Sequence, residues 1–409
     1  MFLPPSFYHN LMPITSPICV RPVRLSWTSP TETSTPAPLA ISRRSRFPLL
    51  AIFVSLYHIS TGQLYAAGLM DSSNAQHISF PDARLVVNGL AWFQEDTPAL
   101  RRLPMRLKDS FRPPVWNLAQ QPSGGRIRFK TDSTRIGLRA QNPDTSGMHH
   151  MTTIGQSGFD IYVDNEYRGS AWPDKSGDII KEWPIGKNPV FREITLYLPL
   201  YKGVTVKEIV VESNARIEKP AGFALKKPIV FYGSSITQGG CASNPGMSYE
   251  AQVARWLNVD FVNLGFSGNG LGEPALADVV SEIDAACFVL DYWGNPTPEV
   301  YKESLPNFVA TLREKYPKTP ILITSPYFIA AETVAQTERA IEEKRNAAKD
   351  FVIQRRKGGD KFISFIDGLE MLSREHAYGL VDGVHCNSLG FYFCAKGLEP
   401  HLKKAIRRF

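Results

Sequence analysis

A serine after one apolar run and a histidine near the end of the chain have the residue types needed for acyl transfer. Ser235 follows the β-branched and aromatic run 229–232 and Gly233, a pattern that predicts a buried strand and then a sharp turn. Open α/β sheets bind their ligands at the carboxyl ends of strands, so Ser235 is well placed to act as a nucleophile. Alternatively, Ser234, Ser235 and Thr237 only satisfy backbone groups in the turn.

A nucleophilic serine needs a base, and the base needs an acid that orients it. Asp382 precedes His385 by three residues within the segment 380–390. One tight loop therefore supplies both groups if it folds back over Ser235. The sequence predicts a triad in which His385 takes the serine proton and Asp382 selects the imidazole tautomer.

Other residues compete for two of these roles. Asp291 and Asp367 each end a predicted strand and could orient the histidine, although both are equally readable as turn or cap residues. We favour Asp382 because of its spacing from His385. His376 is the nearest rival base, but it lies beside Arg374 and Glu375 in a predicted helix, where a solvated histidine is the ordinary expectation.

The two end segments resemble blocks of the SGNH, or GDSL-type, esterase family. That family's first block reads Gly-Asp-Ser-hydrophobe-Thr and is matched by residues 233–237, with Ser234 in place of the aspartate. Its last block, Asp-x-x-His, is matched by Asp382 and His385, and Cys386 stands where the family commonly has proline. The resemblance covers residue 227 to the C-terminus and implies an esterase that uses no metal or organic cofactor.

Two middle segments are similar to the blocks that supply the family's oxyanion donors. Residues 263–270 resemble the second block, in which a glycine supplies a backbone N–H. The matching residue here is Gly268. Residues 291–296 resemble the third block, and its side-chain amide carries over to Asn295, although a proline replaces the usual final aspartate. The resemblance implies an oxyanion hole made by the backbone N–H groups of Ser235 and Gly268 and by the Asn295 amide.

Strands and helices alternate from residue 227 onward, which predicts a flavodoxin-like, doubly wound parallel sheet of five strands in an α/β catalytic domain over 227–409. Ser235, Gly268 and Asn295 follow the first three strands, so their loops should meet at one edge of the sheet. The predicted strands are 229–232, 261–264, 287–290, 321–324 and 362–366, and the helices are 249–257, 298–315, 332–355 and 389–406.

The segment 75–222 has short strands, turn residues and little helical periodicity, which predicts an all-β sandwich domain. Its expected strands are 126–129, 135–140, 159–163, 193–198 and 205–212. Residues 158–162 resemble the Gly-x-Asp-Leu-Tyr signature of a β domain that precedes some bacterial SGNH hydrolases. Carbohydrate contact, a wall of the active site and packing alone all remain open as its role.

We interpret His149 and His150 as a loop pair, because strand neighbours point to opposite faces and no third metal ligand is evident.

Residues 1–68 have the layout of a leader that contains a signal peptide. The basic segment 43–46 precedes the apolar run 47–57, and small residues follow at 66–68. The run is too short to span a bilayer comfortably. We expect cleavage near Gly68, which would give an exported chain, periplasmic or secreted, with no membrane span. We rank this expectation above two alternatives, a transit peptide and an uncleaved anchor.

The composition limits the other classes of function. The chain has 409 residues, of which 43% are hydrophobic, so it can bury a large core. Residues 1–46 contribute a net charge of +4 to the chain's formal net charge of +7, and no basic patch interleaved with aromatics remains to bind nucleic acid. The absence of a Cys-x-x-Cys pair argues against structural zinc. Beyond the leader, four cysteines allow three disulfide pairings, with a buried free thiol expected at Cys287: Cys241, Cys287, Cys386 and Cys394.

These inferences predict a serine esterase that removes acyl groups, with acetyl as the first expectation, from small-molecule or carbohydrate esters outside the cell. Acyl transfer to an acceptor other than water would use the same residues. A carbohydrate-binding protein on a decayed hydrolase scaffold is the alternative of a different class. The sequence does not indicate an oligomeric state.

Overall fold

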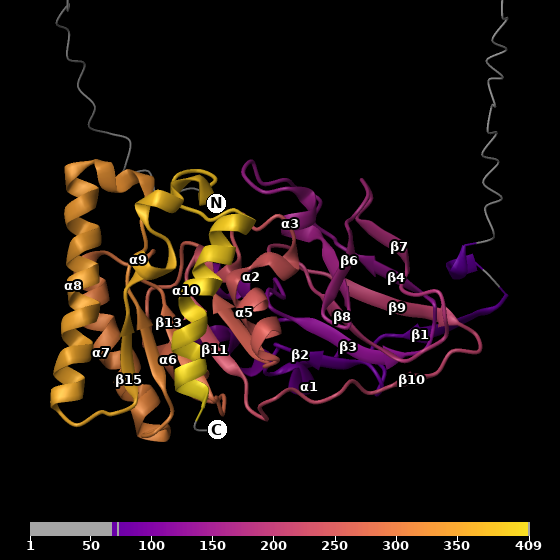
Figure 1. The fold of residues 1–409 in the computed structure, drawn as a ribbon, viewed down its shortest axis with the longest axis horizontal. Helices are drawn as coiled ribbons and strands as arrows, with labels where there is room; N and C mark the ends of the chain where they lie inside the picture. Colours follow the sequence, from indigo (N-terminus) through magenta and orange to yellow (C-terminus); the bar gives the residue numbers. More distant parts are fainter. Residues whose placement is uncertain (1–67, 72, 408–409) are drawn as a thin grey trace, which may run out of the picture. The chain divides into compact units, whose positions relative to one another are not determined.

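The computed structural model describes residues 68–71 and 73–407. The signal-peptide prediction for residues 1–68 therefore falls almost wholly outside the described residues. A β-rich region comes first along the described chain, and an α/β region follows (Figure 1). Within these residues, no helix has the length and hydropathy of a membrane span.

The α/β region is built on a parallel sheet of five strands in the order β12-β11-β13-β14-β15. This order confirms the predicted flavodoxin-like, doubly wound sheet. The first three strands are buried at every position, as expected for parallel strands covered on both faces. The strands are β11 (Ile229–Gly233), β12 (Phe261–Gly265), β13 (Cys287–Asp291), β14 (Ile321–Thr324) and β15 (Ile363–Ile366).

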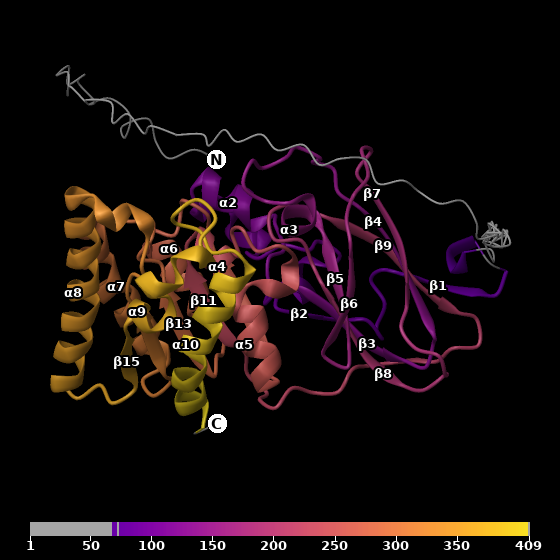
Figure 2. The same ribbon diagram turned by 45° about the horizontal axis from the view of Figure 1, so that its top comes forward.

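Helices cover both faces of the parallel sheet (Figures 1 and 2). Helix α5 packs on α10, whereas α6 packs on α7 and α7 on α8. The predicted helix 332–355 begins three residues late, because residues 330–333 form a 3₁₀ turn instead. The helices are α4 (Ser235–Gln238), α5 (Tyr249–Leu257), α6 (Pro274–Val280), α7 (Pro298–Lys315), α8 (Ala335–Lys357), α9 (Gly368–Met371) and α10 (Ser388–Ile406), with 3₁₀ turns η4 (Pro245–Met247), η5 (Ala330–Thr333) and η6 (Arg374–Gly379).

The β-rich region consists of two antiparallel sheets, β1-β9-β4-β7 and β10-β3-β8-β5-β6, with β2 paired to β3. Side chains from both sheets form one hydrophobic core, which confirms the predicted sandwich. The strands are β1 (Ala75–Ser79), β2 (Val86–Asn88), β3 (Arg126–Thr131), β4 (Arg135–Gln141), β5 (Phe159–Val163), β6 (Glu166–Ala171), β7 (Asp178–Pro184), β8 (Arg192–Tyr197), β9 (Thr205–Glu212) and β10 (Ile217–Glu218).

Short helices interrupt the sandwich, and the sequence did not predict them. They are η2 (Leu69–Asp71), α1 (Phe93–Asp96), η3 (Met105–Ser110), α2 (Pro113–Ala119) and α3 (Thr153–Ser157). Each has at most seven residues, which is too short to show a helical hydrophobic period.

Arg102 joins the two regions. Its buried guanidinium donates to the backbone oxygens of Gln121 at 2.7 Å and Leu118 at 2.8 Å, and also to that of Gly265 at the end of β12. Burial lowers the pKa of Arg102 to about 9, and the carbonyl oxygens compensate its lost hydration. The β-rich region is thus bonded directly to the strand end that precedes the Gly268 loop.

The Gly-x-Asp-Leu-Tyr motif also reaches across to the α/β region. The buried Asp160 carboxylate accepts hydrogen bonds from Asn244 Nδ2 at 2.6 Å and from the Gly246 backbone N–H at 2.7 Å. Tyr162 lies under the Arg255 guanidinium, whose carbon is 4.3 Å from the ring centroid. Among the three roles left open for this motif, these contacts favour packing: it holds the loop that follows α4.

Candidate active site

A tight strand-to-helix turn presents Ser235. Strand β11 ends at Gly233, where a Cβ would lie only 1.8 Å from Thr237 Oγ1, so this close approach requires glycine. Ser234 caps α4, because its Oγ accepts a hydrogen bond from the Ile236 N–H at 3.3 Å. The capping role considered for the whole serine pair therefore belongs to Ser234, and Ser235 opens the helix with its side chain available.

Ser235, His385 and Asp382 form a continuous hydrogen-bonded chain. Ser235 Oγ lies 2.8 Å from His385 Nε2, and Asp382 Oδ2 lies 2.8 Å from His385 Nδ1. Asp382 Oδ1 also accepts the backbone N–H groups of His385 at 2.8 Å and Val384 at 3.0 Å. With Nδ1 protonated and donating to the carboxylate, Nε2 can accept the serine proton.

The charge state of Asp382 suits this arrangement. Partial burial by itself would raise its pKa, but the hydrogen bonds from the His385 side chain and backbone and from the Val384 N–H hold the pKa well below its usual range. The carboxylate is therefore ionised at neutral pH and stabilises a positive charge on the neighbouring imidazole.

The structure assigns the rival residues to other contacts. The buried Asp291 carboxylate accepts from Tyr249 OH at 2.8 Å and Trp293 Nε1 at 2.9 Å. Asp367 caps α9, and its carboxylate accepts the Leu369 N–H at 3.0 Å. His376 differs from the expectation of a solvated side chain, because its ring packs on Phe393 with centroids 4.1 Å apart.

The loops that carry Gly268 and Asn295 pack against the serine turn. A Cβ on Gly270 would lie 2.2 Å from the Gly233 carbonyl oxygen, and one on Gly294 would lie 3.2 Å from Ser234 Oγ. Asn295 Oδ1 accepts the Gly270 N–H at 3.0 Å, which orients the side chain and leaves its amide N–H₂ group to point elsewhere. Gly268 has a φ of +67° with open space where a Cβ would be. Loops after the first three strands thus meet at one edge, as predicted.

Asn295 can be tested by two substitutions that separate its oxygen from its nitrogen. If its amide donates to the oxyanion, Asn295→Ala should lower kcat by about 10²- to 10³-fold with little change in KM. Asn295→Asp keeps the acceptor for the Gly270 N–H but replaces the donor with a negative charge, so it should be at least as slow. Steady-state kinetics on both folded variants measure this. A near-normal kcat for Asn295→Asp would mean that Asn295 holds the loop and does not donate to the oxyanion.

The β-rich region also contributes to this edge. The rings of His150 and His385 meet edge-on with centroids 5.6 Å apart, and Tyr201 OH donates to the Ser235 backbone oxygen at 3.1 Å. Burial and the nearby His385 lower the pKa of His150. His149 and His150 do lie in a turn, as expected, but nothing in the sequence indicated that His150 approaches a residue 235 positions away.

Cys241 is the second residue near Ser235 whose position the sequence did not indicate. It lies in the loop after α4, and His150, Cys241, Asp382 and His385 each offer an atom to one cluster beside Ser235. Burial raises the pKa of the Cys241 thiol to about 12. All four cysteines among the described residues are buried free thiols, including Cys287 as predicted. Cys386 Sγ and Cys394 Sγ are 3.9 Å apart, beyond the length of a disulfide bond.

The chain matches two family descriptions in tandem. Residues 226–403 match the GDSL-like lipase/acylhydrolase family, and residues 76–217 match the N-terminal region of SGNH-hydrolase-type esterases. No curated protein is similar to the chain at the level of significance applied.

Solved structures resemble nearly the whole described chain. A candidate GDSL-like lipase from Bacteroides ovatus is 32% identical, with a TM-score of 0.74, over 82% of this chain and 98% of its own. The salicylyl-acyltransferase SsfX3 of a tetracycline biosynthetic pathway is 21% identical, with a TM-score of 0.70, over 81% and 98%. A family two carbohydrate esterase from Cellvibrio japonicus is 16% identical, with a TM-score of 0.54, over 81% and 98%.

The first of these structures is similar enough in sequence to establish the family, whereas the other two share the fold alone. The earlier resemblance, drawn from the segments around Ser235 and His385, is thereby confirmed over both regions. The chain belongs to the GDSL-like lipase/acylhydrolase family and is an ester hydrolase of the SGNH type.

Proposed function

We propose that this protein is a serine esterase in which Ser235, His385 and Asp382 form the catalytic triad. The observation that carries the proposal is the pair of 2.8 Å contacts that links these three side chains. His385 Nε2 takes the proton of Ser235 Oγ as that oxygen attacks the ester carbonyl carbon, and it then returns the proton to the departing alcohol. Water repeats the sequence on the acyl-serine and releases the acid and free Ser235.

The negative oxygen formed at each attack needs donors that are already in position. We assign this role to the backbone N–H groups of Ser235 and Gly268 and to the Asn295 amide. Each is expected to stabilise the transition state by about 3 kcal/mol. The bond from Asn295 Oδ1 to Gly270 N–H supports the assignment, because it orients the amide before substrate arrives.

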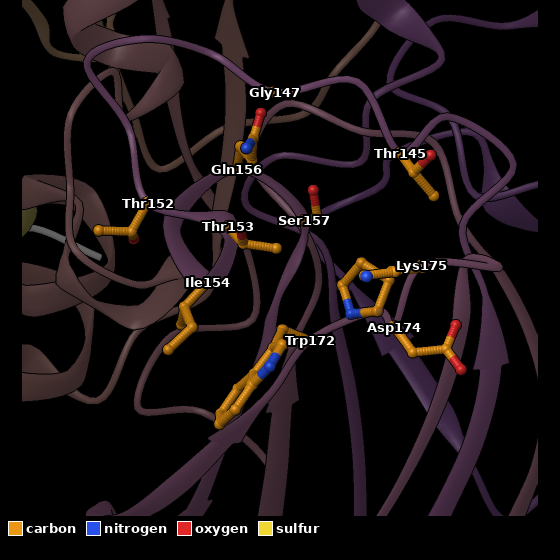
Figure 3. A pocket seen from close by; sticks show the side chains of 11 residues that line it. Thr145, Gly147, Thr152, Thr153, Ile154, Gln156, Ser157, Trp172, Asp174 and Lys175 are labelled. Atoms are coloured by element: carbon orange, nitrogen blue, oxygen red, sulfur yellow. The ribbon is translucent and has the colours of Figure 1, made fainter.

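We infer that the acyl group is acetyl and that its carrier is a carbohydrate. Carbohydrate esterases share the fold, and the β-rich region has a cavity of about 640 Å³, whose lining includes Gly147 and Thr152 on either side of the turn at 149–150 (Figure 3). Trp172, which is 49% exposed, lines this cavity together with polar side chains. An aromatic face with nearby hydrogen-bonding groups suits a sugar ring. Those polar side chains are Thr145, Thr152, Thr153, Gln156, Ser157, Asp174 and Lys175.

A chromogenic acetate ester, followed by acetylated polysaccharides, tests this function. We expect hydrolysis of the first and release of acetate from at least one of the second. Hydrolysis of the chromogenic ester with no acetate from any polysaccharide would reject the carbohydrate substrate, and no hydrolysis would favour a binding protein on this fold. An alcohol acceptor added in excess separates hydrolysis from acyl transfer, since a transferase would form the new ester in preference to free acid.

We also propose that the protein is exported. The basic segment 43–46 and the apolar run 47–57 support a signal peptide, and polysaccharide esters outside the cell suit an exported enzyme. N-terminal sequencing of periplasmic or secreted protein should find a start near Leu69. A cytoplasmic product that retains residues 47–57 would contradict this.

A further inference from the structure

Four potential metal ligands from three separate segments meet beside Ser235. One ligand atom from each of His150, Cys241, Asp382 and His385 lies within 4.8 Å of the other three. The histidine of the β-rich region, the loop after α4 and the loop before α10 each contribute. Only the assembled tertiary structure creates this cluster, because its three contributing segments lie far apart in the sequence.

The backbone around Cys241 brings its thiol to the cluster. A Cβ on Gly240 would lie 3.3 Å from His385 Cδ2 and 2.8 Å from Tyr201 OH, so this loop passes directly against the imidazole. Cys241 then adopts a φ of +72°, which is uncommon for a residue other than glycine. The thiol is buried, and the nearby Asp382 carboxylate adds to the effect of burial in raising its pKa.

The donor set is that of a zinc site. One sulfur, two imidazole nitrogens and one carboxylate oxygen are ligands that Zn²⁺ accepts, whereas Mg²⁺ and Ca²⁺ prefer oxygen alone. In a tetrahedral zinc site the ligand atoms lie about 3.3 to 3.8 Å apart, as follows from bond lengths of about 2.0 to 2.3 Å. Small side-chain rotations would bring the present atoms to those distances. A thiolate, a carboxylate and two neutral imidazoles also balance the charge of Zn²⁺.

Coordination at this site is incompatible with the triad. Both nitrogens of His385 are already used, Nε2 toward Ser235 and Nδ1 toward Asp382. Whichever nitrogen binds a metal, one of these two hydrogen bonds is lost. Zinc binding therefore removes either the base or its orientation.

We propose that Zn²⁺ binds reversibly to His150, Cys241, Asp382 and His385 and thereby inhibits the esterase. Binding displaces the Cys241 thiol proton to solvent and forms the metal–ligand bonds without any oxidation or reduction. The inhibitory part rests on the proposed function of the triad, whereas the binding part does not.

Zinc binding is measured first on the Ser235→Ala variant. This variant keeps all four ligands, and the binding measurement does not depend on esterase activity. Native mass spectrometry and equilibrium dialysis with ZnCl₂ should find one Zn²⁺ per chain, and MgCl₂ at the same concentration should not bind. Absence of one-to-one zinc binding would overturn the proposal, whatever the esterase assays show.

Variants of the two ligands outside the triad then test the site itself. Cys241→Ser and His150→Ala should each weaken zinc binding by at least about tenfold, since the loss of a residue that only orients a ligand already costs about that much, and leave kcat for the chromogenic ester within a few fold. The matched control is His149→Ala, which removes the exposed neighbour in the same turn and should change neither.

In the wild-type enzyme, zinc should inhibit hydrolysis of the chromogenic ester with a midpoint equal to its dissociation constant, and a chelator should restore activity. Equal zinc affinity for His150→Ala and the wild type, or activation by zinc, would contradict the proposal. His150 lies in a surface turn, so its variant decides the outcome even if the buried Cys241→Ser variant fails to fold.

Discussion

Ser235→Ala is expected to lower kcat by about 10⁴-fold or more, because the variant lacks the hydroxyl that we propose forms the acyl intermediate. The Ser235 Oγ is the serine oxygen that contacts His385 Nε2, at 2.8 Å. KM should change little, since the hydroxyl contributes mainly to the reaction and not to substrate binding. Steady-state turnover of a chromogenic acetate ester measures the loss.

The neighbouring Ser234 offers a matched control. Its side chain accepts the Ile236 N–H and caps α4, so Ser234→Ala should cost about 1 kcal/mol of stability and leave kcat near the wild-type value. Equal losses in the two variants would mean that the turn is fragile or that the nucleophile is misassigned. A serine-directed phosphonate should label Ser235. An adduct that mass spectrometry finds on another residue would reject the assignment of Ser235 as the nucleophile.

Asp382→Asn should lower kcat by about 10³- to 10⁴-fold while the fold is preserved. The asparagine amide can donate to His385 Nδ1, which leaves the proton on Nε2. That tautomer cannot accept the proton of Ser235, and the positive imidazole formed during attack loses its neighbouring carboxylate. The measurement is kcat together with the thermal unfolding temperature, so that lost activity is separated from lost structure.

Asp367 provides the comparison for this variant. It is an acid at the end of a strand that the sequence could not exclude, and its carboxylate caps α9 through the Leu369 N–H. Asparagine is also a good helix cap, so Asp367→Asn should retain both stability and activity. A near-normal kcat for Asp382→Asn, or an equal loss for Asp367→Asn, would remove Asp382 from the proposed triad.

The parallel strands were predictable because both their faces are buried. Strands such as β11 and β13 are continuous apolar runs, and such runs can be recognised without knowing their partners. Strands β6 and β7 were missed because neither shows a regular alternation of exposed and buried residues. Their positions depend on pairing within the sandwich, and a single strand does not show that pairing.

The residues of the proposed triad were also readable from the sequence, because Asp382 and His385 share one tight loop and Ser235 follows a recognisable strand. Spacing from His385 already favoured Asp382 over Asp291, and the structure adds the reason that other donors surround the Asp291 carboxylate. A carboxylate at the end of a strand looks the same in sequence whether it faces a histidine or a tyrosine.

The sequence by itself determined the fold of both regions and the family, since these depend on local hydrophobic patterns and short motifs. Only the tertiary structure decided that His150 and Cys241 stand beside His385, and that Asp160 holds the loop after α4 through Asn244. These contacts join residues more than 80 positions apart, and no local pattern shows which distant residue each of them meets. Their geometry exists only once two separately patterned regions have packed on each other, because packing and not sequence spacing sets the distance between them.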